Sequence, residues 1–433
     1  MTYKRQLHQN HRIIRSRSPQ FANDNNMHSF VYGILGGTII GLAAAILLLF
    51  SGDILGASGI ISSVTLSPIS SLQDSKQHWK LVFLACFLLT SHLFFSSVYD
   101  DKDNGLASLS WAAFLIGGFF VGFGTKLGNG CTSGHGICGL ARFSMRSLLS
   151  VCTFMVMGAL TSYLTQEATT PFSKDVFDFL RSDPQEEPLK IWTTVAALVS
   201  GFVALTALVA PSLSIPKEQE TFPVNDRAKL APAAVAGTLF AVGLYISQMV
   251  YPVRVLGFLN VGLMAQGDWD ATLMFVMGGG LVISILSYQA VDGYNTIASR
   301  IMSTSELYHP LTKPLALSEG STFSVPCNAV IDRNLIFGAM CFGLGWGISG
   351  LCPGPAMVLA GVGHSWVLAC YWPAFFVGAL LAERYCSIAC SRSMQEESNM
   401  TKATAPQAST RLFDLENSDS ELMADSRNCD IQA

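Results

Sequence analysis

Long apolar stretches decide what this chain can fold into. A helix of about 17 to 25 mainly apolar residues can cross the hydrocarbon core of a bilayer, and nine such stretches occur. They lie near residues 30–50, 79–97, 107–125, 146–164, 191–210, 230–250, 271–290, 335–350 and 366–383. Only 13% of the residues are charged, against roughly 25% in soluble domains. The sequence therefore predicts an all-α polytopic membrane protein with about nine transmembrane helices.

Four of these stretches run directly into a semi-apolar segment that contains glycine or proline and is too short to cross. The segments are Gly52 to Leu66, Gly128 to Ala141, Tyr251 to Met264, and Gly350 to Gly363. Non-helical backbone at membrane depth is tolerated only where protein buries it or where it lines a watery cavity. We therefore expect four re-entrant half-helices that line a path.

The chain also contains an internal repeat. Two triplets, each of two glycines and a cysteine, have the same spacing: Gly122, Gly124 and Cys131, then Gly343, Gly345 and Cys352. They follow the third and the eighth stretch, which are an odd number of crossings apart, so the two units should face opposite ways across the membrane. Inverted repeats with broken helices at matching positions indicate a binding site near the midplane of a transporter. The sequence thus predicts two inverted pseudo-repeats.

This repeat divides the chain into five parts. We predict a first half at 30–165 and a second half at 230–385, with a connector at 166–229 that contains a linking helix. The basic tail at 1–29 and the acidic, Ser-rich tail at 386–433 are predicted to be disordered, because few of their residues are apolar.

The predicted half-helices favour an anion. A helix that begins at membrane depth presents unpaired N–H groups and the positive end of its dipole. Fixed charges at this depth are few, namely Lys126, Arg142 and Arg254. Four converging helix starts would offset part of the cost of dehydrating a small anion without holding it tightly, and an ion must be able to leave a pathway.

Cys131 and Cys352 stand at equivalent positions of the repeat. A thiol is a weak donor but a soft, polarizable partner for sulfur, so the pair favours a substrate with a terminal sulfur. The alternative is that both are small residues needed where helices pack closely. Cys131, His135 and Cys138 also form a C-x3-H-x2-C cluster of zinc or copper ligand types, without an evident fourth ligand. His135 either caps the half-helix or relays protons. We expect no metal and no cofactor.

Three segments resemble the YeeE/YedE family of sulfur transport membrane proteins. They are GCTSGHGICGLARFSMRS at 130–147, GWGISGLCPGPA at 345–356 and FLNVGLMAQGDWDATLMFVMGGG at 258–280. The last is similar to the segment that opens the partner half in members split into two proteins. The chain as a whole therefore resembles a fusion of two family halves.

This resemblance implies uptake of sulfur-containing ions such as thiosulfate, with loop cysteines contacting the passing ion. The implied contact residues are Cys131 and Cys352, and the other expected pathway residues are Ser58, Ser133, Gly134, His135, Cys138, Arg254, Pro353 and Gly354. The chain departs from the family pattern at Gln248, where a glycine is expected, at Arg254, where lysine is usual, and at Asn260, where an acid is common. Persulfide, selenium-containing and other small anions stay open as substrates.

The sequence holds no ATP-binding G-x-x-x-x-G-K-[ST] loop, which favours secondary or channel-like transport by a protein that is not an enzyme. Two rival functions are a membrane sulfurtransferase with Cys131 as its nucleophile and a metal-ion transporter. The expected partners are the anion, membrane lipid and a soluble sulfur-acceptor protein, with no nucleic acid. We expect the plasma membrane rather than an organelle membrane.

Overall fold

The computed structural model describes residues 26–95, 109–166, 227–266, 269–294, 310–317, 322–326 and 330–404. Within these ranges the chain forms helices and loops, apart from one isolated bridge between Val291 and Leu311. The all-α prediction is therefore confirmed.

The helices of the first half are α2 (Asn26–Ile46), η2 (Leu47–Ser51), α3 (Ala57–Leu66), α4 (Pro68–Gln73), η3 (Ser75–Gln77), α5 (His78–Thr90), η4 (Ser91–Phe95), α6 (Trp111–Leu127), η6 (Thr132–Gly139) and α7 (Met145–Gln166). Those of the second half are α11 (Leu230–Ile246), α12 (Pro252–Leu259), η7 (Val261–Gln266), α13 (Thr272–Gln289), α15 (Arg333–Ser349), α16 (Pro353–Val362), η8 (Val367–Tyr371) and α17 (Trp372–Thr404).

Five helical stretches are long and apolar enough to cross a membrane: Phe30–Ser51, Ser75–Phe95, Met145–Thr165, Thr272–Gln289 and Val367–Ile388. Two further spans are bent pairs, α6 with η6 at 45° and α15 with α16 at 41°. The helix α11 is apolar but shorter, and the predicted stretch at 191–210 lies outside the described residues. The count of nine is thus not confirmed, because five helices, or seven with the bent pairs, meet the criterion.

Short helices lie at all four segments where half-helices are predicted, namely α3, η6, α12 and α16. The preceding helices η2, which continues α2, and α15 are capped by Gly52 and Gly350, whose φ values of 75° and 67° favour glycine. Gln248 follows α11 with a φ of 60°. A left-handed backbone at this position gives a physical reason for expecting a glycine there.

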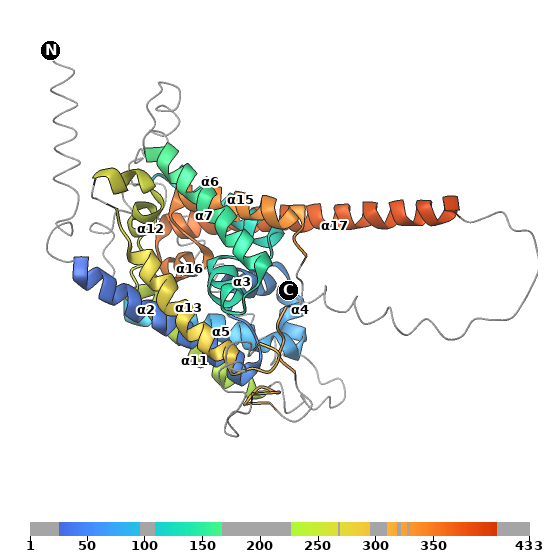
Figure 1. The fold of residues 1–433 in the computed structure, drawn as a ribbon, viewed down its shortest axis with the longest axis horizontal. Helices are drawn as coiled ribbons and strands as arrows, with labels where there is room; N and C mark the ends of the chain where they lie inside the picture. Colours follow the sequence, from blue (N-terminus) through green and yellow to red (C-terminus); the bar gives the residue numbers. More distant parts are fainter. Residues whose placement is uncertain are drawn as a thin grey trace, which may run out of the picture.

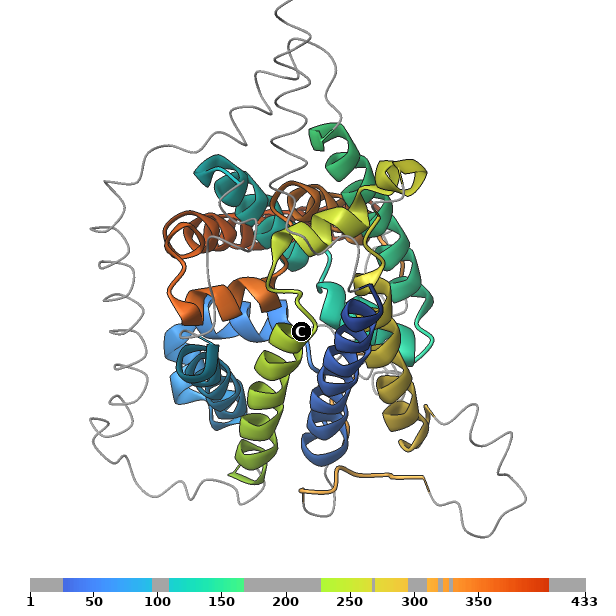
Figure 2. The same ribbon diagram turned by 90° about the vertical axis from the view of Figure 1, so that its left-hand side faces the viewer.

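The packing of the helices repeats between the halves. α2 packs on α13 as α11 packs on α5, and α6 packs on α17 as α15 packs on α7. Two helices also pack on their own counterparts from the other half, α2 on α11 and α6 on α15. Figure 2 shows α11, α2 and α13 side by side.

Glycine contacts between α6 and α15 show that the two halves are inverted. A Cβ on Gly117 would lie 3.1 Å from the carbonyl oxygen of Gly345, and a Cβ on Gly338 would lie 2.9 Å from that of Gly124. The early part of each helix therefore meets the late part of the other, so α6 and α15 are antiparallel. When the two halves are aligned so that Gly124 matches Gly345, Gly117 matches Gly338. The two contacts are therefore equivalent in the repeat.

The helix α17 runs beyond the bundle to Thr404 (Figure 1). The helix therefore occupies residues 386–404, which the sequence analysis assigns to a disordered tail. Neither glycine nor proline occurs between Gly378 and Pro406, so nothing in that stretch breaks a helix. The rest of the predicted acidic tail, and the predicted basic tail up to residue 25, lie outside the described residues.

We expect the close approach of helices to tolerate no side chain at Gly122 or Gly343. A Cβ at these positions would lie 2.0 Å from the carbonyl oxygen of Phe375 and 2.5 Å from that of Phe154. Gly122→Ala or Gly343→Ala should therefore lower the melting temperature in detergent, with a cost of about 1 to 3 kcal/mol or more. Gly278→Ala is the control, because its Cβ would meet nothing within 4 Å. Equal melting temperatures for all three variants would contradict this packing.

Candidate functional site

The starts of the four short helices lie close together. The backbone N–H of Ala57, at the start of α3, donates to Ser133 Oγ in η6 over 3.2 Å. The Thr132 hydroxyl, at the start of η6, donates to Cys352 Sγ before α16 over 3.5 Å. A Cβ on Gly350 would lie 2.8 Å from the carbonyl oxygen of Pro252, the first residue of α12. Pairwise contacts thus link all four starts.

The two repeated cysteines occupy equivalent places at these starts. Cys131 precedes η6 and Cys352 precedes α16, both with an extended backbone and without a side-chain cap bond. Cys131 is 1% exposed and its Sγ lies 3.3 Å from Ser133 Oγ, whereas Cys352 is partly exposed. A thiol therefore stands where a serine or aspartate would normally satisfy the first amides of a helix.

The site is asymmetric in its hydrogen-bond donors. Thr132 and Ser133 follow the first cysteine, and Pro353 and Gly354 follow the second. Proline has no N–H, so the start of α16 offers fewer donors than that of η6. Thr132 is a site residue that the sequence analysis missed, although aligning the halves on their cysteines sets a hydroxyl opposite Pro353.

Open space borders the first turns of α3 and η6. A Cβ built on Gly56, Gly59 or Gly134 would meet nothing within 4 Å. The side chain of Ser58, on the same turn of α3, is buried at 3% exposure. These three glycine positions therefore leave room beside the backbone of the two turns.

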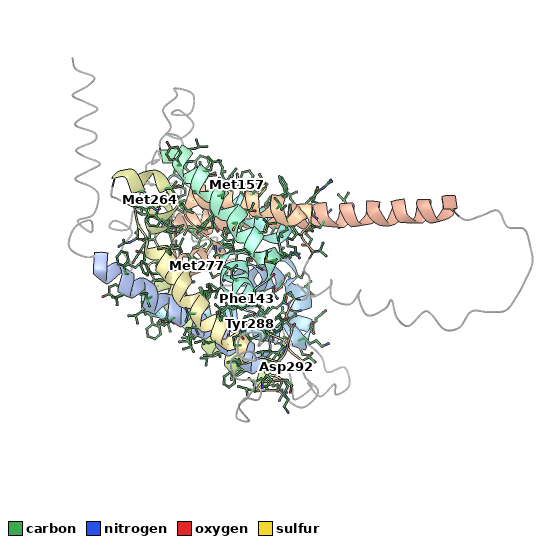
Figure 3. All side chains as sticks on the ribbon, in the orientation of Figure 1. Phe143, Met157, Met264, Met277, Tyr288 and Asp292 are labelled. Atoms are coloured by element: carbon green, nitrogen blue, oxygen red, sulfur yellow. The ribbon has the colours of Figure 1, made fainter. Side chains whose placement is uncertain are left out.

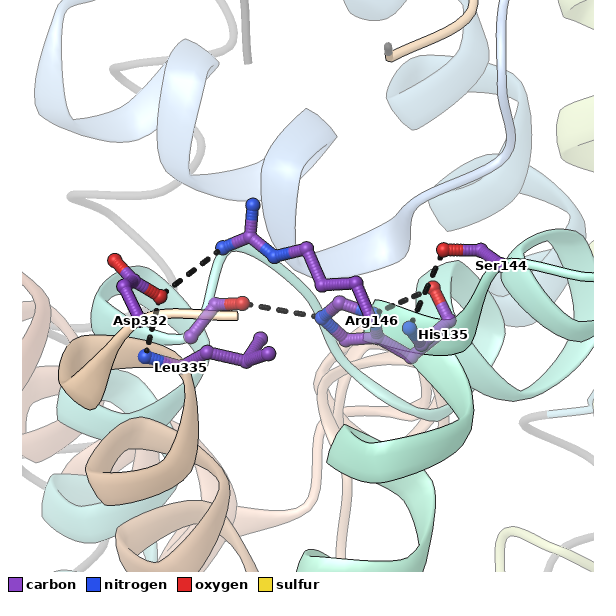
Figure 4. Close-up of polar contacts among 7 residues, drawn as sticks. His135, Ser144, Arg146, Asp332 and Leu335 are labelled. Atoms are coloured by element: carbon purple, nitrogen blue, oxygen red, sulfur yellow. Dashed lines mark hydrogen bonds and ion pairs between the residues drawn. The ribbon is translucent and has the colours of Figure 1, made fainter. Parts of the chain in front are cut away.

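His135 holds the loop together. Its Nε2 lies 3.1 Å from the carbonyl oxygen of Gly128 and its Nδ1 lies 3.1 Å from Ser147 Oγ, as Figure 4 shows. A carbonyl only accepts, so Nε2 carries the proton and, in the neutral ring, Nδ1 accepts from the Ser147 hydroxyl. The ring therefore ties the end of α6 to the start of α7, and both nitrogens are engaged.

Cys138 lies on another side of η6. Its thiol points to the carbonyl oxygen of Leu55 at 3.6 Å. Cys131, His135 and Cys138 thus each contact a different group. Among the described residues no group of three or more His, Cys, Asp or Glu side chains is placed to hold a metal ion.

Two of the three cations singled out in the sequence are ion-paired. Arg254, on α12, donates to Asp270 over 2.9 Å, with the two side chains 20% and 19% exposed. Lys126 lies 3.8 Å from Glu383. An anion near the helix starts would therefore meet mainly amides, hydroxyls and thiols.

Known proteins resemble both halves of the chain. Residues 3–161 match a family described as sulphur transport, and residues 228–394 match a family of unknown function, DUF6691. A probable transporter of Xylella fastidiosa, strain Temecula1, is 39% identical over 150 residues, which cover 35% of this chain and 82% of that protein. A second probable transporter of that strain is 35% identical over 136 residues, which cover 31% of this chain and 95% of that protein.

The contact between Thr132 and Cys352 predicts a specific cross-link. In a Cys131→Ala background, Thr132→Cys should form a disulfide with Cys352 under mild oxidation, because the two side chains touch. Mass spectrometry of the digested protein would detect the linked peptides. The matched control is Thr125→Cys in α6, whose hydroxyl is buried against Gly122. A cross-link absent from the first variant, or equally frequent in both, would contradict this geometry.

Proposed function

We propose, from the premise that this chain belongs to the sulphur transport family, that it moves a small sulfur-containing anion such as thiosulfate past the thiols of Cys131 and Cys352. The chain is an integral, multi-pass membrane protein. The observation that carries the proposal is the contact between the two equivalent helix starts, made by the Thr132 hydroxyl and the Cys352 thiol.

The donors at this contact suit an oxyanion that ends in sulfur. Each helix start favours negative charge by about 0.3 to 1 kcal/mol, or up to about 2 when partly buried. Ser133 accepts from the Ala57 amide, so its own hydroxyl hydrogen can turn from the Cys131 thiol, 3.3 Å away, to an oxygen of the ion. The soft thiols would contact the terminal sulfur. Without a fixed charge against the ion, its release stays fast enough for transport.

Two joined halves explain how one chain would carry the ion across. Each relative is matched along most of its own length by about a third of this chain, which supports two fused transport units. Because the halves are inverted, the path through η6 opens toward one face and the path through α16 toward the other. We place the chain in the plasma membrane, with transfer between Cys131 and Cys352 at the midplane.

A sulfurtransferase is the rival function, and the burial of Cys131 argues against it. A thiol that is 1% exposed is out of reach of a soluble sulfur-acceptor protein unless the loop opens. Turnover of thiosulfate by the purified protein in detergent, where no compartment exists, would favour the enzyme over the transporter.

Uptake of labelled thiosulfate tests the proposal in cells that lack their own importer. Cys131→Ala and Cys352→Ala should each reduce uptake at least about fivefold, because a lost contact to a buried donor costs about 1 to 3 kcal/mol. Cys152→Ala is the matched control, since that thiol is exposed on α7. Normal uptake by both Cys131→Ala and Cys352→Ala at equal expression would contradict the proposal.

Thr132 offers a finer test of the same site. Thr132→Val keeps the shape but removes the hydroxyl, so uptake should fall by roughly five- to a hundredfold. Thr132→Ser retains the hydroxyl and should restore most of the rate. If valine and serine behave alike, the hydroxyl takes no part in recognition.

A further inference from the structure

Two arginines with few negative partners lie near the junction of η6 and α7, Arg142 in the turn between them and Arg146 in the first turn of α7. Arg146 is only 8% exposed, and in the described part of the chain it pairs with Asp332, with 3.7 Å between nitrogen and oxygen (Figure 4). Arg142 donates from one terminal nitrogen to the carbonyl oxygen of Pro326 over 2.8 Å. The Nε atoms of both arginines are buried and have no hydrogen-bond partner among the described residues.

Asp332 offsets little of this charge. Its side chain is 46% exposed, and its Oδ1 accepts from the Leu335 amide over 3.1 Å as the N-cap of α15. A guanidinium carries five N–H donors, and a buried charge that lacks close partners is strongly unfavourable. Arg146 also lies in the first turn of α7, where the positive end of the helix dipole disfavours a cation. In the described part of the chain, the negative group beside Arg146 is thus a half-exposed carboxylate 3.7 Å away, and the buried Nε–H has no acceptor.

The other half shows that the fold does not require a charge here. Ser144 Oγ accepts from the Ser147 amide, and His364 Nδ1 accepts from the Val367 amide in the equivalent turn. Arg146 therefore corresponds to Trp366, two residues after the capping residue in each half.

Asp332, the partner of Arg146, also has an uncharged counterpart in the other half. Asp332 caps α15 through the Leu335 amide, and Ser110 caps the equivalent helix α6 through the Ala113 amide. An uncharged serine thus occupies the equivalent place in the other half. The charged pair Arg146 and Asp332 therefore occurs in one half and not at the equivalent positions of the other. The packing that both halves share does not depend on it.

We propose that Arg142 and Arg146 bind a small oxyanion at the far end of η6 from Cys131. The assignment of this anion as the transported ion waiting beside the path rests on the proposed function, whereas the binding itself does not. The site reads charge and oxygen atoms through guanidinium N–H groups. It therefore accepts sulfate and thiosulfate alike and leaves selection for sulfur to the cysteines.

Equilibrium binding of labelled sulfate to the purified full chain, in uncharged detergent at low ionic strength, tests the proposal. Wild-type protein should bind about one sulfate, and Arg146→Gln and Arg142→Gln should each weaken binding at least about tenfold. Lys126→Gln is the charge-matched control, because Lys126 already pairs with Glu383. Equal sulfate binding by wild type and Arg146→Gln would overturn the site.

Two further binding experiments separate this oxyanion site from the cysteine pathway and from a lipid-headgroup site. A Cys131→Ala, Cys352→Ala double variant should bind sulfate normally, so this result stands even if the cysteines prove irrelevant to transport. Displacement of sulfate by a lower concentration of short-chain phosphatidylglycerol would instead assign the arginines to a lipid headgroup and overturn the role beside the path.

Thermal unfolding checks for a purely structural role of Arg146. Arg146→Met removes an unmatched buried charge, so in sulfate-free buffer its melting temperature should equal or exceed that of wild type. Sulfate should raise the melting temperature of wild type but not that of Arg146→Met, because a ligand stabilises the folded state that binds it. A lower melting temperature for Arg146→Met without sulfate would mean that Arg146 serves only as the partner of Asp332, and the proposal would fail.

Discussion

Backbone groups at membrane depth need partners inside the protein, and the rest of this structure depends on that requirement. A continuous helix meets it alone, whereas the loops before α3, η6, α12 and α16 need neighbouring side chains. Ser133 accepts from the amide of Ala57, and His135 donates to the carbonyl oxygen of Gly128. Among the described residues, the same polar groups that satisfy the broken helices are those that an ion at these helix starts would contact.

Inversion of the two halves brings these helix starts together. Glycines let α6 and α15 approach in antiparallel fashion, so that Gly117 meets Gly345 and Gly124 meets Gly338. The starts of the four short helices are then linked by contacts between them. The two halves differ in the residues that follow the cysteines, because Thr132 and Ser133 in the first half correspond to Pro353 and Gly354 in the second. One half supplies most of the donors, and the other supplies a more accessible thiol.

Local patterns in the sequence predict the broken helices and the repeat, because glycine, proline and cysteine spacing follows from backbone geometry. Contacts between distant segments could not be read in this way. Whether Thr132 reaches Cys352, and whether Arg254 meets Asp270, depends on how whole helices pack. The helix over residues 386–404 does not follow from composition, because polar residues that favour disorder also form a helix where no glycine or proline interrupts them. The described residues contain five helices that meet the length and hydropathy criterion, or seven with the bent pairs, because α11 has only 17 residues and the stretch at 191–210 lies outside them.

Selectivity between thiosulfate and sulfate is the most direct test of the claim that soft thiols at helix starts choose the ion. The two anions share charge and approximate shape, but only thiosulfate has a terminal sulfur. The decisive measurement is the initial rate of entry of each labelled anion, alone and at equal concentration, into liposomes that contain the purified chain. The account predicts that thiosulfate enters at least about ten times faster, which corresponds to one lost contact. Equal rates would contradict it, because the path would then select by charge and shape alone.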